Sequence, residues 1–125
     1  MSQPPDGRTL IVKCTAGADE PERCAQAFTV AATAAAAGVP TSLWLTGEAA
    51  WFGVPGHAER FRLPHSAPLA ELRDTVLSLG TLTVCTQCAQ RRGIEPESLV
   101  PGVRIAGSAS FVDEILRPAA QAVVY

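Results

Sequence analysis

The sequence predicts an α/β fold, a three-layer sandwich in which a mainly parallel, five-stranded sheet carries helices on both faces. Short apolar, β-branched segments alternate with helical segments, glycine or proline separates them, and no internal repeat is present. Such alternation is typical of parallel sheets, because each helix returns the chain to the edge where the next strand begins. The flavodoxin-like order 2-1-3-4-5 is the commonest way to wind five such strands, so we predict it.

Five segments have the composition of strands. The first, Thr9–Cys14 (TLIVKC), is short, apolar and β-branched, as a central strand should be. The later ones follow glycine- or proline-containing turns. The predicted strands are 9–14, 41–45, 81–84, 103–106 and 120–125.

The segments between the strands carry helix signals. The first opens with acidic residues, runs through an alanine-rich stretch and stops at Gly38, which suggests a helix packed closely against the sheet. The predicted helices are 19–37, 47–52, 68–79, 85–92 and 108–116. The glycine- and proline-rich loop 53–68 is long for a compact domain, and loops of this length are functional or mobile.

Composition limits the function classes. A chain of 125 residues, 47% hydrophobic and 18% charged, predicts one globular domain over 1–125 with a flexible N-terminal arm at 1–7. The net charge is −2 and no basic run exceeds two arginines, so we expect neither nucleic acid nor membrane as a partner. The first residues do not resemble a signal peptide, which makes the cytoplasm the expected compartment. No phosphate-binding glycine motif is present, so no cofactor is predicted.

The segment 83–94, TVCTQCAQRRGI, contains the candidate catalytic residues. Cys85 follows directly on the third predicted strand and opens the next helix, where unpaired N–H groups and the helix dipole favour an anion. Cysteines at such positions have lowered pKa values, and the thiolate is the nucleophile. Cys88 lies one turn further along and is the candidate resolving thiol. Cys85 and Cys88 are therefore the predicted catalytic residues.

Five more residues are candidate accessories. Cys14 ends the first strand and would lie beside Cys85 if the first and third strands are neighbours. Arg91 and Arg92 could attract an anionic persulfide, although arginines in a last helical turn also complement the dipole. His57 and His65 could reach over the sheet edge as acid or base, although a solvated loop position is the ordinary alternative.

Other interpretations of Cys-x-x-Cys stay open. Two cysteines in a short helix can be buried small hydrophobes. A structural zinc site needs four ligands, and no second pair of matching spacing is present, so no metal is predicted. A thioredoxin-type protein would carry the motif early in its domain rather than after the third strand.

The segment VCTQCAQRRGI resembles the C-x-x-C-x-x-x-R-G-I motif of DsrE/DsrF-like proteins, specifically the YchN-like members, and is also similar to the corresponding segment of the sulfur-relay subunit TusD. The segments SLWLTGEA, PGVRIAG and the ending AVVY fit the same layout, so the resemblance spans most of the chain. The cysteine-containing turn CTAGADEPE departs from it.

The resemblance implies a function. It implies that Cys85 accepts sulfur as a persulfide and passes it to an acceptor thiol, with partner proteins as donor and acceptor. It also implies assembly as a homo-oligomer, a trimer or hexamer. We expect a sulfurtransferase-like carrier. The alternatives are a non-catalytic binding or scaffold module of the same fold and a thiol-disulfide redox protein that uses Cys85 and Cys88.

Overall fold

The computed structural model describes residues 7–125, so all but the last residue of the predicted N-terminal arm lies outside the described residues. The strands are β1 (Thr9–Cys14), β2 (Thr41–Leu45), β3 (Thr81–Cys85), β4 (Arg104–Ala106) and β5 (Ala120–Val124). The α-helices are α1 (Pro21–Ala36), α2 (His57–Arg60), α3 (Leu69–Leu79), α4 (Thr86–Arg91) and α5 (Ser108–Ile115). Two 3₁₀ helices, η1 (Gly47–Gly53) and η2 (Pro96–Ser98), complete the described part.

Most predicted elements are confirmed. The first two strands have the predicted bounds, and the others differ by one residue at one end. The loop 53–68 was predicted without a helix but contains α2, whose Glu59 is held by the buried Arg73 of α3 at 2.8 Å. This ion pair joins α2 to the body of the protein. Four residues are too few for a helical period to be recognised in the sequence.

The sheet is wholly parallel, and its strand order is β4-β3-β2-β1-β5. The predicted α/β fold class is therefore confirmed, whereas the predicted order 2-1-3-4-5 is wrong. The strand β2, not β1, lies beside β3. The apolar composition of each strand marks it as buried but does not specify its neighbour, because every strand in a parallel sheet shows a similar pattern.

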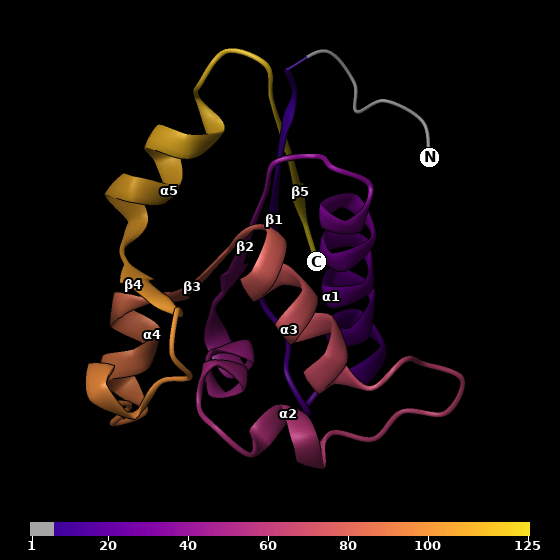
Figure 1. The fold of residues 1–125 in the computed structure, drawn as a ribbon. Helices are drawn as coiled ribbons and strands as arrows, with labels where there is room; N and C mark the ends of the chain where they lie inside the picture. Colours follow the sequence, from indigo (N-terminus) through magenta and orange to yellow (C-terminus); the bar gives the residue numbers. More distant parts are fainter. Residues whose placement is uncertain (1–6) are drawn as a thin grey trace.

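The strand order explains which face each helix covers. The chain steps from β1 to β2 to β3 in one direction, and right-handed crossovers then put α1 and α3 on the same face. The last crossover runs back from β4 to β5, so α5 lies on the opposite face. Figure 1 shows α1 and α3 on one side of the sheet and α5 on the other.

The two faces of the sheet differ in chemistry. On the α1 face, alternate strand residues form the apolar core with alanines of α1, whose small side chains allow a close approach. This set includes Val12, Leu43, Leu45, Leu82 and Val84. The α5 face carries the intervening residues, which are mostly polar or aromatic: Lys13, Ser42, Trp44, Thr83 and Arg104. None of the helices in residues 7–125 combines the length and the apolarity needed to cross a bilayer.

Candidate functional site

The carboxyl ends of the strands form the edge at which the predicted site lies. At this edge β3 ends at Cys85, which is the N-cap residue of α4, as the sequence predicts. The 3₁₀ helix η1 follows β2 and contacts α4. Figure 1 shows α2 and α4 at this end of the sheet.

The surroundings of Cys85 lower the pKa of its thiol. Cys85 is two residues beyond Thr83, so strand alternation puts it on the α5 face. The residue keeps 8% of its surface exposed. Burial raises the pKa of Cys85, but the backbone N–H and thiol of Cys88, the backbone N–H of Gln87 and the charge of Lys13 together lower it below its ordinary value. The thiolate expected at a helix start is thus favoured here.

Cys88 is held by the turn that follows β2. The backbone N–H of Gly47 donates a hydrogen bond to the Cys88 sulfur at 3.2 Å. Gly47 has φ +55°, and a Cβ there would lie 2.8 Å from the carbonyl oxygen of Thr15. Only glycine fits this turn without strain. A glycine required by its neighbours therefore positions the second thiol of the motif.

Lys13 is a residue of the site that our sequence analysis did not select. It is the single lysine of the chain and lies at the carboxyl end of β1, on the α5 face. Its ammonium lies 5.0 Å from the centroid of the Phe111 ring, which itself packs edge-on against Trp44 at 5.3 Å. A charged residue in an otherwise apolar strand was the available signal.

A buried polar network lies beside these aromatic side chains. The Glu114 carboxylate of α5 accepts hydrogen bonds from the Ser42 hydroxyl at 2.7 Å and the Trp44 indole at 3.1 Å, and it pairs with Arg104 at 2.6 Å. Arg104 also donates to the Thr83 hydroxyl at 2.9 Å. Burial opposes ionisation of Glu114, but Arg104, Ser42 and Trp44 hold its pKa below the usual range. The network anchors α5 over β2, β3 and β4.

Cys14 does not lie beside Cys85, contrary to the geometry expected from the predicted strand order. The strand β2 separates β1 from β3, and the register puts Cys14 in the row of Leu45 and Val84, on the face opposite Cys85. Its thiol is fully buried and donates to the carbonyl of Ala16 at 3.1 Å. Its neighbour is Cys24 of α1, whose pKa is raised by the hydrogen bond with Cys14 and by burial. These two cysteines form a separate, buried pair.

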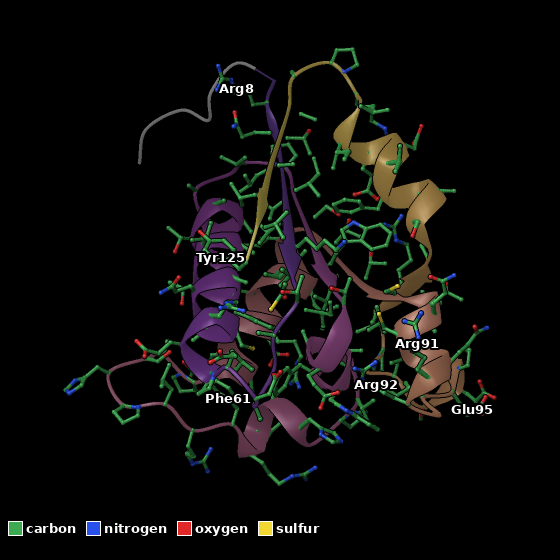
Figure 2. All side chains as sticks on the ribbon, turned by 180° about the vertical axis from the view of Figure 1, so that it is seen from behind. Arg8, Phe61, Arg91, Arg92, Glu95 and Tyr125 are labelled. Carbon is green, nitrogen blue, oxygen red and sulfur yellow. The ribbon has the colours of Figure 1, made fainter. Side chains whose placement is uncertain are left out.

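The two arginines after the motif have different surroundings. Arg92 pairs with Glu48 of η1 at 2.7 Å and donates to the backbone carbonyl of Cys88 at 3.1 Å, so it fastens the end of α4 to η1. Arg91 is exposed. Figure 2 shows both arginines at the end of α4, on the same flank of the molecule as Glu95. Arg92 therefore has a structural role in this arrangement.

Neither histidine is brought to the cysteines. His57 stacks on Trp51 with ring centroids 5.2 Å apart, and burial and the nearby Arg60 lower its pKa. His65 is exposed, has φ +59° and lines a hollow against α1. The long loop folds toward α1 and η1 rather than over the α5 face, which explains why both histidines point elsewhere. Within residues 7–125, no three His, Cys, Asp or Glu side chains converge as a metal site would require.

A solved structure and a protein sequence are among those that resemble this chain. The crystal structure of the YchN protein from E. coli matches with a TM-score of 0.78 over 94% of this chain and 99% of that chain, at 14% identity, which shows a common fold. An uncharacterized protein of Methanocaldococcus jannaschii is 27% identical over 110 residues. That match covers 87% of this chain but 40% of the archaeal protein, so the chain spans about two fifths of the length of that relative.

The match to a family covers almost the whole described fold. The sequence pattern of the DsrE/DsrF-like family extends over residues 9–124, from the first residue of β1 to the last of β5. It includes the strand-to-helix junction at Cys85 and the turn that holds Cys88. The expected resemblance is confirmed over this range. The chain belongs to the DsrE/DsrF-like family.

Proposed function

We propose that the protein is a sulfur carrier that accepts sulfur as a persulfide on Cys85 and passes it to an acceptor thiol. The observation that carries the proposal is the position of Cys85. Cys85 is the N-cap residue of α4, its pKa is lowered, and the residue keeps 8% of its surface exposed. The contact with Cys24 also lowers the pKa of Cys14, but Cys14 and Cys24 are fully buried. Membership of a family that is generally linked to sulfur relay supports the same assignment.

The proposed transfer of sulfur from donor to acceptor needs no oxidant or reductant. The Cys85 thiolate attacks the outer sulfur of a donor persulfide, a new S–S bond forms on Cys85, and the donor S–S bond breaks. The donor leaves as a thiolate. In the second step an acceptor thiolate attacks the outer sulfur on Cys85, which takes that sulfur away and restores the Cys85 thiolate. A lowered pKa supplies the nucleophile in the first step and a good leaving group in the second.

Cys88 gives the site a second possible outcome, and its contact with Cys85 is the reason to test for it. If Cys88 attacked the inner sulfur of the Cys85 persulfide, a Cys85–Cys88 disulfide would form and hydrosulfide would leave. A dithiol of this kind would serve a thiol-disulfide redox protein. The two chemistries differ in mass, since a persulfide adds one sulfur and a disulfide removes two hydrogens.

The test is mass spectrometry of the intact protein and its peptides after incubation with a small-molecule persulfide donor. We expect an adduct of about +32 Da on Cys85, lost in Cys85→Ser and kept in the control Cys24→Ser. Cys88→Ser should prolong the adduct if Cys88 resolves it. Equal labelling of all four cysteines would contradict the sulfur-carrier proposal. A loss of about 2 Da without any persulfide would favour the redox protein, and no change at all would favour a binding module.

A further inference from the structure

We propose that Lys13 is a positioning residue whose ammonium group holds the sulfur anion of Cys85 in place, first as thiolate and then as persulfide. This inference rests on the proposed sulfur-carrier function and deepens it. It names a cation on a different strand as the partner of the transferred group. This cation lies outside the Cys-x-x-Cys motif.

The sheet register puts Lys13 on the same face as Cys85. Lys13 pairs with Trp44 of β2, and Trp44 pairs with Thr83 of β3, so the three lie in one row across the sheet. Cys85 is the next residue on that face of β3, one step toward the carboxyl edge. Two strand spacings, about 10 Å, separate the backbones of β1 and β3. The four-carbon stem of lysine can cover much of that width.

The aromatic side chains hold the ammonium on this face. The Lys13 nitrogen lies 5.0 Å from the Phe111 ring centroid, within the range of a cation–π contact. Phe111 is in turn fixed by Trp44, with ring planes 81° apart. The positive charge is therefore kept over the α5 face rather than left to turn into solvent. It is also close enough to lower the pKa of Cys85.

Lys13 differs from the nearby arginines because no carboxylate within residues 7–125 lies within ion-pair distance of it. Arg104 pairs with Glu114 at 2.6 Å, and Arg92 pairs with Glu48 at 2.7 Å. A half-buried cation without an anion is costly unless an anion binds there. The charged and titratable groups on the elements that meet at this end of the sheet include Lys13 of β1, Arg104 of β4, Glu114 of α5, Glu48 of η1, Cys88 and Arg91 of α4, and Arg92 directly after α4.

The experiment measures the rate of alkylation of Cys85 against pH, by peptide mass spectrometry. The charge is removed in Lys13→Gln and Lys13→Met and kept in Lys13→Arg. Arg23→Gln is the matched control, because it removes one positive charge from an exposed position on α1, across the sheet. Lys13→Met keeps an apolar stem against Phe111, so it is the second variant if Lys13→Gln does not fold. Circular dichroism checks the fold of each.

The midpoint is the pH at which the alkylation rate of Cys85 reaches half of its maximum. We expect it to rise by about 0.5–1 pH unit in Lys13→Gln and Lys13→Met. In Lys13→Arg and Arg23→Gln it should stay near the wild-type value. Persulfide loading at pH 7 should fall about 3- to 10-fold in the same two variants. Wild-type midpoints in both folded, charge-free variants would overturn the inference. If the wild-type protein loads no sulfur, the proposed function fails, and the alkylation midpoints still decide whether Lys13 acts on Cys85.

Discussion

At the scale of single residues, the two cysteines of the motif are positioned by different structural features. Cys85 depends on its place at the start of α4, whereas Cys88 depends on a hydrogen bond from Gly47 in another element. Sequence reasoning could find Cys85, because a cysteine directly after a strand and before a helix is visible in one dimension. It did not identify Gly47 or Lys13, because both reach the site from segments far away in the sequence, and the only local signal was the lysine in an otherwise apolar strand.

Gly47→Ala tests the device that holds Cys88. A Cβ at this position meets both a left-handed φ and the Thr15 carbonyl at 2.8 Å, so the turn must shift. We expect the free energy of unfolding to fall by about 1–3 kcal/mol, measured by urea denaturation. We also expect faster alkylation of Cys88, because the turn that covers its sulfur moves away.

The control for this variant is Gly38→Ala. Gly38 has φ +87° with open space around the position of a Cβ, so its replacement brings strain without a collision. A smaller loss of stability and unchanged Cys88 reactivity are expected there. If the two variants behaved alike, the contact with Thr15 would have no part in holding the turn.

At the scale of elements, polar contacts decide how the irregular segments pack. The short α2 has little apolar surface, and its link to α3 is the bidentate pair between Glu59 and the buried Arg73, at 2.8 and 3.2 Å. The hydrogen bond from Arg73 lowers the pKa of Glu59 to about 2. Sequence patterns could not predict this ion pair, because its partners are 14 positions apart and most of the chain between them is irregular.

Glu59→Gln should therefore destabilise the protein in a pH-dependent way. The pKa of Glu59 is lower in the folded state than the ordinary value of 4.5, so its contribution is present above pH 4.5 and is lost as the pH falls toward 2. Glu59 is half exposed, so solvent screening limits the loss at pH 7 to about 1 kcal/mol. Urea denaturation at pH 7 and pH 3 measures the difference in free energy of unfolding between the wild type and Glu59→Gln. At pH 3 we expect less than half of the difference found at pH 7.

Glu71→Gln is the matched control for this prediction, since Glu71 is an exposed carboxylate on α3. We expect it to change stability little at either pH. A Glu59→Gln effect of the same size at pH 3 as at pH 7 would mean that the carboxylate charge does not stabilise α2.

At the scale of the whole molecule, the α5 side is the incompletely covered one. It carries one helix, and three large hydrophobic residues are exposed there: Val112 on α5, Leu116 directly after α5, and Val124 on β5. The homo-oligomer implied by the family resemblance stays a prediction. Burial of such side chains between copies would supply part of the free energy of assembly.

Light scattering after gel filtration tests this prediction. We expect a mass of three or six times the chain mass of 13.1 kDa. Leu116→Asp should reduce the mass, because it places a charge on a side chain that is 75% exposed in the single chain and would be buried in an assembly. An exposed charge on α1, Gln26→Glu, is the control. A monomer at all concentrations would contradict the expectation.

The α/β class, the bounds of every element except α2 and η2 to within two residues, and the position of Cys85 at a strand-to-helix junction could be predicted from the sequence. These features are local: strand composition, helix stop signals and the residue that follows a strand are read within a few positions. The tertiary structure decided the strand order, the separation of Cys14 from Cys85, the remote histidines, and the approach of Gly47 and Lys13. Those features depend on which strands pair, and strands that are all buried and apolar leave that choice to packing between segments distant in the chain.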